Sequence, residues 1–371
     1  MSVPYTEIRD DSNILIHFSL LTVSFITTTD LNLKGRNHMK KAITLILALM
    51  MVFSLVACSG GSSSSGSSAQ KVSITLGHTN NTEHHYHKLS ENFKKYVEEA
   101  ANGSVEVNVF PAEQLGSGQA MLESVKSGTQ DIVLDPDAYL ANYNNLFNVF
   151  SLAYQFDNWD KVEAFLTSEA RTVLEKAAED SGFVILGWTA NGFRYFTTVK
   201  EIKSVADLKG IKLRTGSNDL VIKLYSALGC APTSLSMSDT YNGISTHIVD
   251  GQENSLANII GNKFYEVAPY LTLTRHIYTW EPLIMSKATW DKLTPDQQKV
   301  LKEAGEKACA EDFEFCKASE ADDLKTIENG GGIICEVNTD EFKALMEPVN
   351  EDYVAGQDDA FKTLYELIKG L

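Results

Sequence analysis

The sequence predicts an α/β fold of two lobes with a ligand cleft between them. Short segments alternate apolar and polar residues as strands do, and segments with apolar residues at helical spacing follow them. This strand–helix rhythm is typical of a largely parallel sheet and occurs twice along the chain, before one long helical segment near the carboxyl end. Two such units in a secreted chain indicate hinged lobes that close around a ligand.

The first α/β unit begins at residue 72. Residues 72–76 and 105–110 alternate apolar and polar side chains, and residues 131–134 complete the unit as a short strand. Residues 87–100 place apolar side chains at helical spacing, and a further helix is expected around Met121. The order strand, helix, strand, helix, strand predicts a largely parallel sheet for this unit.

The second unit repeats the rhythm and ends in the long helix. Residues 183–187 and 211–214 are strand-like, and residues 219–228 have the spacing of a helix. From residue 296 to residue 329 the helical pattern is uninterrupted. Pro295 stands immediately before this segment, where its fixed φ angle suits the first turn of a helix.

The amino-terminal part predicts a lipoprotein signal peptide over residues 39–57. Lys40 and Lys41 precede an apolar run over residues 42–56, which is shorter than the about 20 apolar residues that a membrane span needs. The run closes with Leu-Val-Ala-Cys, which resembles the lipobox of bacterial lipoproteins, where the cysteine is lipidated and begins the mature protein. We therefore expect lipid attachment at Cys58; the alternative is an ordinary signal peptide with an incidental cysteine.

The segments on either side of this signal are not expected to belong to the folded domain. Residues 1–38 contain an interrupted apolar stretch, but a clean signal begins at Met39. We interpret residues 1–38 as a mis-assigned start; the alternative is a genuine extension. Residues 58–70 are rich in serine and glycine, a composition typical of flexible linkers, and we expect them to tether the domain to the lipid.

The composition excludes several classes of function. The chain has 371 residues and a formal net charge of −17, so it repels phosphate backbones, and nucleic-acid binding is not expected. It carries no Walker, GxGxxG, HExxH or GxSxG motif in the structural context that each requires. The cysteines beyond position 58 form no CxxC pair, which argues against a zinc ribbon or a redox motif, and we expect buried free thiols at Cys230, Cys309, Cys316 and Cys335.

Two arginines and one amide are the candidate ligand-binding residues. Arg194 follows a strand, Arg214 ends one, and Asn254 lies in a polar segment expected to be a turn after a helix. The arginine fork donates two parallel hydrogen bonds to a carboxylate, and an amide can satisfy the remaining lone pairs. The alternative is that each arginine pairs with an acidic side chain on the protein surface.

Four segments give the chain a specific resemblance from about residue 72 to the carboxyl terminus. It resembles the solute-binding subunits of the tripartite ATP-independent periplasmic (TRAP) transporters, of the dicarboxylate-type family. The segments that carry the resemblance are FPAEQLG (110–116), NGFR (191–194), DLKGIKLR (207–214) and VDGQEN (249–254). In that family the arginines that end the second and third segments hold the ligand carboxylate, and the asparagine that ends the fourth assists.

The resemblance implies the roles of those residues, the fold and the partners. Arg194 and Arg214 are implied to bind the carboxylate of a small organic acid, with help from Asn254. The fold implied is like that of periplasmic binding proteins, with lobes joined by crossing strands and the long helix: lobe one covers 71–191 and 280–319, and lobe two covers 192–279 and 320–371. The implied partner is a pair of membrane permease subunits driven by an ion gradient rather than by ATP.

Two loops after strands of the first unit are candidates for ligand specificity, because ligands of open α/β sheets bind beyond the carboxyl ends of strands. One loop carries His78 and Thr79, and the other carries Asp135 and Asp137. Aspartates near a carboxylate are repulsive unless they accept hydrogen bonds from hydroxyls or an amine. They therefore favour a sugar acid, such as a uronate or an aldonate, over a C4-dicarboxylate; the alternative is that they face solvent or cap a helix.

Met237 and a run of histidines complete the list of candidates. Met237 stands where many relatives carry an aromatic residue in the cleft, so ring stacking on the ligand is in doubt. The histidines in residues 84–87 raise the question of a metal, but adjacent residues at a helix start point in different directions. We expect a solvated helix entrance there, with no metal site and no cofactor.

The function predicted is an extracytoplasmic, lipid-anchored receptor that captures a small organic acid by lobe closure and passes it to a permease. It is not expected to be an enzyme. The alternatives are a ligand-sensing subunit of a membrane signalling receptor and a secreted metal-dependent hydrolase that uses the histidines.

Overall fold

The structure, a computed structural model, describes residues 71–134 and 137–371. The predicted start (1–38), signal (39–57) and tether (58–70), with Cys58, lie outside the described residues, as does Asp135. Within the described ranges, no helix combines the length and the hydropathy that a membrane span requires.

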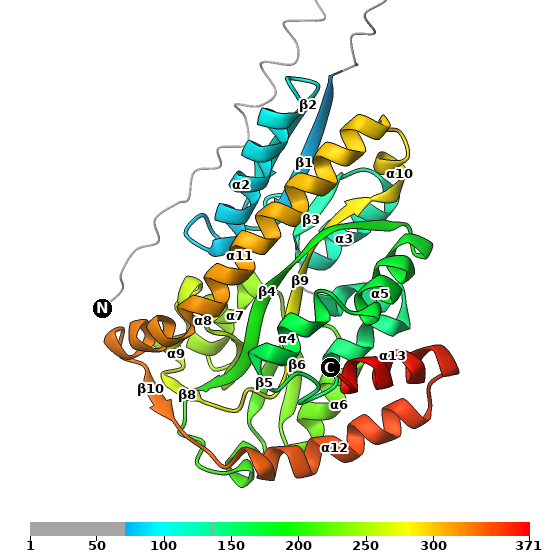
Figure 1. The fold of residues 1–371 in the computed structure, drawn as a ribbon. Helices are drawn as coiled ribbons and strands as arrows, with labels where there is room; N and C mark the ends of the chain where they lie inside the picture. The colour runs from blue at the N-terminus through cyan, green and yellow to red at the C-terminus, as the bar shows by residue number, and fades with distance from the viewer. Residues whose placement is uncertain (1–70, 135–136) are drawn as a thin grey trace, which may run out of the picture. The chain divides into compact units, whose positions relative to one another are not determined.

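A parallel group of three strands forms one end of the sheet system (Figure 1). Strand β1 lies between β2 and β3, and all three run parallel. Helices connect them as the strand–helix rhythm predicts, and buried apolar side chains line the face where the helices pack. The elements are β1 (Val72–His78), α2 (His85–Ala100), β2 (Val105–Phe110), α3 (Gly118–Ser127) and β3 (Ile132–Leu134).

A second group of strands forms the other end. Strand β5 pairs in parallel with β6 and β7, and β7 is antiparallel to the later half of β4. Strand β8 pairs with β4 on the other side and carries β10 at the edge. The elements are β5 (Lys212–Thr215), α6 (Asp219–Ala227), β6 (Ala231–Ser234), α7 (Met237–Ser245), β7 (Gly251–Ser255), α8 (Leu256–Gly261), α9 (Phe264–Val267), β8 (Tyr270–Thr272) and β10 (Ile333–Cys335).

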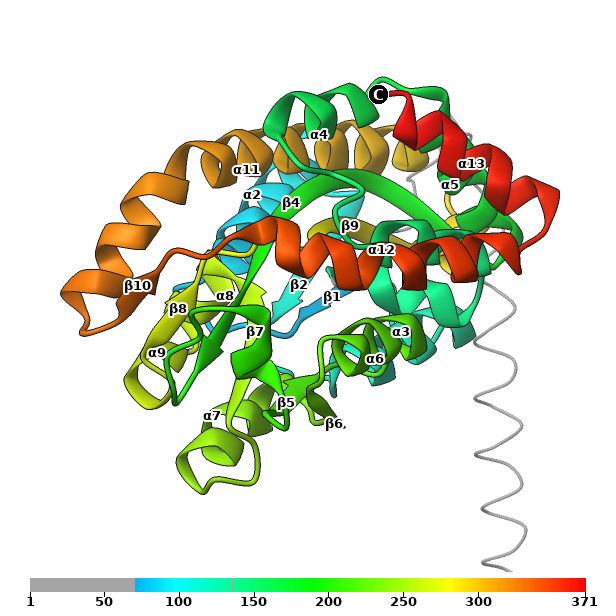
Figure 2. The same ribbon diagram turned by 90° about the horizontal axis from the view of Figure 1, so that it is seen from below.

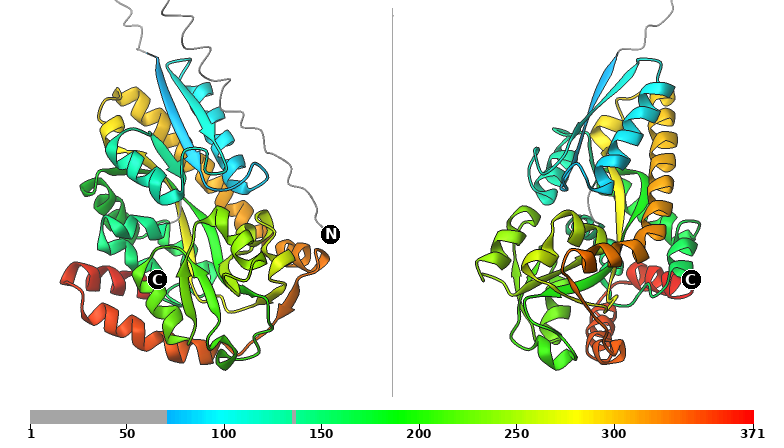
Figure 3. Two further views of the ribbon diagram at one scale, coloured as in Figure 1. Left: turned by 180° about the vertical axis from the view of Figure 1, so that it is seen from behind. Right: turned by 90° about the vertical axis from the view of Figure 1, so that its left-hand side faces the viewer.

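Two long antiparallel strands, β4 (Phe183–Thr198) and β9 (Tyr278–Ser286), connect the two groups. Strand β9 pairs with β3, whereas the later half of β4 pairs with β7 and β8. The views of Figure 3 show β4 running from the β1–β3 group to the β5–β7 group. The ladder shifts register between Ala190 and Gly192, where Gly192 has a φ of +101°. A bulge of this kind re-aims the side chains that follow it.

The long helix α11 (Pro295–Asn329) packs along the crossing strand β4 and against α2 (Figure 1). Thr294 caps it, with the Gln297 side chain completing a capping box. The helix backbone lies very close to β4 at Gly305, because a Cβ added there would lie only 2.7 Å from the Leu186 Cβ. The close approach of helix and strand therefore requires glycine at position 305.

The carboxyl-terminal helices pack against each other and against other helices of the molecule (Figure 2). Helix α12 contacts α6, and α13 contacts the 3₁₀ helix η2 and α5. The remaining elements are η1 (Asp137–Asn142), η2 (Asn145–Ser151), α4 (Trp159–Phe165), α5 (Glu169–Asp180), η3 (Val205–Leu208), α10 (Lys287–Trp290), α12 (Thr339–Ala355) and α13 (Asp359–Lys369).

The structure confirms the predicted α/β fold and the long helix, and it corrects two local predictions. The sheet is less parallel than expected, because β4 and β9 are both antiparallel to their neighbours. Residues 249–254 were expected to form a polar turn, but β7 is a fully buried strand. Two of its buried polar side chains interact with residues of β4. Gln252 donates to the Thr197 hydroxyl over 2.6 Å, and Glu253 forms an ion pair with Arg194.

The four described cysteines are free, as predicted, and three of them are buried. Cys316 differs, because it is partly exposed. Cys309 and Cys316 occupy the same helix, where their separation prevents a disulfide.

Candidate functional site

A cavity of about 90 Å³ contains both predicted arginines, and we call it the arginine cavity. Strands β4, β5 and β7 supply one wall, and the starts of α6 and α7 supply another. Its lining residues are Tyr139, Phe150, Ser151, Asn191, Arg194, Arg214, Gly216, Ser217, Asn218, Val221, Tyr225, Met237, Glu253, Asn254, Asn258, Ile277 and Thr279. The structure thus brings together Arg194, Arg214, Asn254 and Met237, which the sequence analysis selected.

A second cavity of about 180 Å³, the adjoining cavity, shares five lining residues with the first. Its other residues come mainly from loops of the first strand group and from the segment before α7. They are Thr79, Asn80, Tyr86, Glu113, Ser117, Gly118, Gln119, Ser234, Leu235 and Ser236. Thr79 therefore lines the adjoining cavity and not the arginine cavity, and its ligand role stays a prediction.

Hydrogen bonds connect the two sides of these cavities. The Ser217 hydroxyl donates to the Gln119 side chain over 2.9 Å. The Asn262 amide donates to the Asn80 side-chain oxygen over 3.2 Å, and the Asn81 amide donates to the Gly261 carbonyl over 2.7 Å. Such contacts between segments of the two strand groups are those expected of lobes closed on each other.

Arg194 forms a two-point ion pair with Glu253. The arginine Nε lies 2.5 Å from Oε2 and Nη2 lies 2.9 Å from Oε1, while Nη2 also donates to the Glu253 carbonyl. Nη1 donates to the Thr279 hydroxyl over 3.2 Å. Arg194 therefore pairs with an acid of the protein, but not with a surface acid as the alternative had it. The carboxylate is buried rather than on the surface, with 3% of the Glu253 side chain exposed.

Glu253 is kept ionised by its surroundings. Burial alone would raise the pKa of Glu253, but the charge of Arg194 and a hydrogen bond from His276 outweigh it and hold the pKa at about 2. His276 Nε2 lies 3.4 Å from Oε2, and burial lowers the pKa of His276 itself. Burial would lower the pKa of Arg194 as well, but the charge of Glu253 raises it overall. The pair is therefore electrically neutral as a unit.

Arg214 has a different environment. Its Nε and Nη2 both donate to the Leu235 carbonyl, at 3.0 and 2.7 Å, and the residue is 3% exposed. Among the described residues no carboxylate lies within ion-pair distance of it. Burial lowers the pKa of Arg214, although an arginine stays charged at neutral pH. A guanidinium has five N–H donors, so Arg214 keeps donors and a positive charge for a bound anion.

An amide network orients Asn254. Its side-chain oxygen accepts from the Asn258 amide over 2.8 Å, which directs the Asn254 amide group toward Met237 Sδ, 3.9 Å away in the cavity. Asn191 accepts from Ser255 and from Asn258 in the same network. The amide nitrogen of Asn191 and the side-chain oxygen of Asn258 are buried without a hydrogen-bond partner. A buried donor and a buried acceptor in the lining suit a ligand that offers both hydroxyl and carboxylate groups.

Of the predicted specificity residues, His78 lines neither cavity. It is fully buried, with Nε2 3.2 Å from His87 Nδ1. Burial lowers the pKa of His78 to about 3. Asp135 lies outside the described residues, and Asp137 begins η1. Their ligand roles stay predictions.

Several lining residues were not selected from the sequence. Glu113 belongs to the segment 110–116, and its backbone has a φ of +58°, which turns the loop so that its amide donates to the His78 carbonyl. Glu253 immediately precedes Asn254, and Asn258 lies four residues beyond it. Proximity to the recognised segments was the available signal for all three.

The histidine run is not a solvated entrance, and that expectation is wrong. His84 and His85 are 4% and 6% exposed. His84 caps α2, with its Nδ1 accepting from the Tyr86 amide over 3.2 Å. The reason is that α8 and α11 pack over the start of α2, so that the helix entrance is an interior contact.

Comparison with known proteins agrees with this site. The model of the bacterial extracellular solute-binding proteins, family 7, matches residues 76–357. A TRAP periplasmic solute-binding protein of Sulfitobacter sp. NAS-14.1, solved with bound β-D-galacturonate, is 30% identical, has a TM-score of 0.78, and the match covers 81% of this chain and 100% of that one. The sugar acid binding protein of Advenella mimigardefordensis, solved with galactonate, is 28% identical at a TM-score of 0.77, covering 81% and 99%.

A relative with a different ligand name is nearly as similar. The C4-dicarboxylate-binding periplasmic protein of Vibrio cholerae is 28% identical over 295 residues, which are 79% of this chain and 87% of that protein. These relatives are solute receptors of transporters and not enzymes, and they favour transport over signalling. The fold, the arginine cavity and the matched length agree: this chain belongs to family 7 of the bacterial extracellular solute-binding proteins, the receptors of TRAP transporters.

Proposed function

We propose that this receptor binds a sugar acid, of the uronate or aldonate kind, with its carboxylate on Arg214. The observation that carries the proposal is the buried Arg214 charge, which has no carboxylate of the described residues within ion-pair distance. A ligand carboxylate there gains a charge-assisted pair in a site from which water is excluded. The Asn254 amide is directed into the same cavity and can donate to the second carboxylate oxygen.

Arg194 has a supporting role in this proposal. Because Glu253 takes two of its N–H groups and neutralises its charge, Arg194 offers the ligand a hydrogen bond rather than a full counter-charge. The two arginines are therefore unequal: Arg214 binds the carboxylate, and Arg194 with Glu253 forms a rigid polar wall.

Glu113 supports a sugar acid over a C4-dicarboxylate. It lines the adjoining cavity, opposite the arginines, and its charge acts on Arg214. A carboxylate in this position repels the second carboxylate of a dicarboxylic acid but accepts hydrogen bonds from hydroxyls. The orphaned Asn258 oxygen in the same lining also calls for a donor such as a hydroxyl. The relatives solved with galacturonate and galactonate bind acids of this type.

A thermal-shift panel on the purified protein tests the ligand class. The panel contains galacturonate, glucuronate, galactonate and succinate. An uncharged or shortened analogue of each acid is measured as its control. A bound ligand stabilises the native state by about 2.7 kcal/mol at a hundredfold excess over its Kd. We expect a shift with a uronate or an aldonate and little with succinate. A strong shift with succinate alone would reassign the ligand class to C4-dicarboxylates.

We also propose that Cys58 carries a lipid and that the receptor, held at the outer face of the membrane, passes its ligand to the permease subunits. The Leu-Val-Ala-Cys sequence supports the lipid, and the family supports the permease partner. Fractionation of cells expressing the full chain tests the anchor. The wild type should sediment with membranes and Cys58→Ser should not; equal sedimentation of both would contradict lipidation at Cys58.

A further inference from the structure

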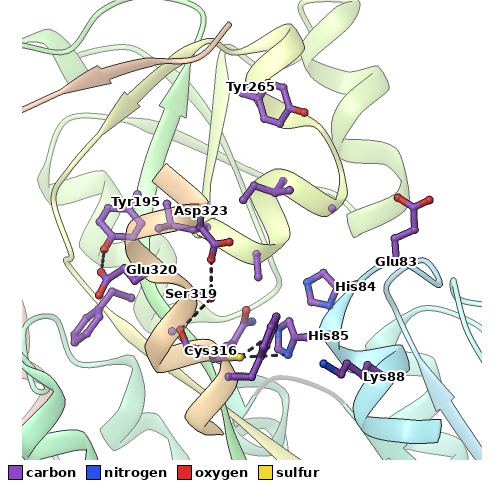
Figure 4. A pocket seen from close by; sticks show the side chains of 18 of the residues that line it. Glu83, His84, His85, Lys88, Tyr195, Tyr265, Cys316, Ser319, Glu320 and Asp323 are labelled. Atoms are coloured by element: carbon purple, nitrogen blue, oxygen red, sulfur yellow. Dashed lines mark hydrogen bonds between the residues drawn. The ribbon is translucent and has the colours of Figure 1, made fainter. Parts of the chain in front are cut away.

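A third cavity, of about 400 Å³, lies apart from the ligand site, between the start of α2, helix α8 and the middle of α11. We call it the α11 cavity. Figure 4 shows His84 and His85 entering it from α2, while Cys316, Ser319, Glu320 and Asp323 project from successive turns of α11. Asn191 is the one lining residue that it shares with the arginine cavity. Neither carboxylate binding nor lobe closure as described above uses the residues on its α11 side.

Three metal-ligating side chains converge beside this cavity: His85 and Cys316 line it, and Asp312 is buried next to them. His85 Nδ1 lies 3.0 Å from Asp312 Oδ2 and 3.4 Å from Cys316 Sγ, and Sγ lies 3.9 Å from Oδ2. The three ligand atoms fall within 4.8 Å of one another. A tetrahedral zinc ion with ordinary Zn–N, Zn–O and Zn–S bonds separates such atoms by about 3.4–3.6 Å. The observed triangle is therefore within about half an ångström of the size that zinc requires.

We propose that His85, Asp312 and Cys316 form a binding site for a divalent transition-metal ion, with Zn²⁺ the best match. Imidazole, carboxylate and thiolate together are the donor set of zinc rather than of calcium or magnesium, which take oxygen ligands. A carboxylate and a thiolate also neutralise the charge of the ion. Water from the α11 cavity supplies the fourth position, as in other sites with three protein ligands.

The surroundings of the three residues suit this role. The Thr189 hydroxyl donates over 2.8 Å to Asp312 Oδ2, the oxygen that faces His85 and Cys316, and so restrains the carboxylate. A supporting hydrogen bond of this kind is typical of metal ligands. His85 and Asp312 are both buried, whereas Cys316 borders the open cavity. A metal ion can therefore enter through the cavity and bind to side chains that are already held in place.

The ion ties the start of α2 to the middle of α11, because His85 belongs to α2 and Asp312 and Cys316 belong to α11. This is a structural role, independent of the organic-acid ligand. This metal site differs from the expectation drawn from the sequence, which considered only whether the adjacent histidines could bind one metal together. Adjacent histidines do diverge, but His85 meets two residues that lie 227 and 231 positions further along the chain.

Cobalt substitution is the most direct test, because a Co²⁺–thiolate bond has a characteristic charge-transfer absorption. Protein purified from cells expressing the full chain is stripped with a chelator and titrated with Co²⁺, and then with Zn²⁺ by calorimetry. We expect the thiolate band to saturate at one Co²⁺ per chain, Zn²⁺ to displace it, and Zn²⁺ to raise the unfolding temperature. Absence of the band in the wild type would overturn the proposal.

Two variants and a matched control identify the ligands. Cys316→Ala should abolish the cobalt band. Asp312→Asn removes a direct ligand and should weaken Zn²⁺ binding by more than about tenfold, because removing a residue that only supports a ligand already weakens binding by about that factor. Cys335→Ala removes a thiol from β10, far along the chain, and should change neither. Unchanged sugar-acid binding shows that each variant is folded. Stoichiometric Zn²⁺ binding that survives in Cys316→Ala would place the metal elsewhere and overturn the site.

Discussion

Arg194 and Glu253 form a buried two-point ion pair in the wall of the arginine cavity, with Nε–Oε2 and Nη2–Oε1 distances of 2.5 and 2.9 Å. This pair separates the roles of two arginines that the sequence presents as equivalent. Arg194 is already neutralised by the protein, whereas Arg214 is bonded only to the Leu235 carbonyl among the described residues. We therefore propose that the ligand carboxylate supplies the counter-charge of Arg214.

Arg214→Ala should weaken sugar-acid binding by about 2–5 kcal/mol, because it leaves a buried carboxylate without its charged partner. Calorimetric titration with the ligand found in the thermal-shift panel measures the loss. Arg171→Ala is the matched control, since Arg171 pairs with Glu175 and Glu306 away from the cavities. A near-native affinity for Arg214→Ala would exclude Arg214 as the carboxylate receptor.

Glu253→Gln should destabilise the fold by about 3–5 kcal/mol at neutral pH, because it leaves the Arg194 charge buried without a partner. The folded pKa of Glu253, about 2, lies below the value of about 4.3 for an unfolded glutamate, so the ionised side chain contributes stability above that value. This contribution is lost as the pH falls through about 2.

Urea denaturation of both proteins between neutral pH and pH 2.5 measures this effect. The difference in unfolding free energy should be constant above the unfolded pKa and shrink at lower pH. Glu175→Gln, at a partly exposed ion pair, should show a much smaller difference. A difference for Glu253→Gln that stays the same at every pH would show that the carboxylate charge is not what stabilises the site.

Glu113→Gln should move specificity from sugar acids toward dicarboxylates. Removing the charge costs a hydroxyl-to-carboxylate hydrogen bond, about 1.5–3 kcal/mol, and removes the repulsion of a second ligand carboxylate. Titrations with a uronate and with succinate measure the two changes. Glu83→Gln, at the rim of the α11 cavity, is the control. Parallel losses for both ligands would mean that Glu113 supports the loop without reading the ligand.

Gly305→Ala should destabilise the fold by about 1–3 kcal/mol through overpacking. The new Cβ would lie 2.7 Å from the Leu186 Cβ and 2.8 Å from the Leu186 carbonyl oxygen, so α11 and β4 must separate. Thermal or urea unfolding measures the effect, with Glu303→Ala on the exposed face of the same helix as control. A stability equal to that of the wild type would show that α11 can shift without loss.

The local elements were predictable because each follows from neighbouring residues. Strand β2 (Val105–Phe110) coincides with its predicted range, and α11 begins one residue before it, at Pro295. The crossing strands were not predictable in full. The predicted strand 183–187 is only the start of β4, which continues to Thr198 because its later half is covered by β7 and β8. That covering depends on residues distant in the sequence.

The site divides in the same way. The sequence allowed us to select Arg194, Arg214 and Asn254 because each lies in a recognisable segment. Met237 and Thr79, also selected from the sequence, line the cavities as well. The pairing of Arg194 with Glu253 could not be predicted, because the alternation of residues along β4 does not reveal that β7 is the neighbouring strand. The cluster of His85 with Asp312 and Cys316 requires α2 to meet α11, a tertiary contact without a local signal.

A crystal structure with the sugar acid identified in the thermal-shift panel tests the central claim most directly. The account predicts the ligand carboxylate within hydrogen-bond distance of Arg214 and of the Asn254 amide, with the Arg194–Glu253 pair intact and ligand hydroxyls on Glu113 and Asn258. A carboxylate bound elsewhere, with Arg214 still held only by the Leu235 carbonyl, would contradict it.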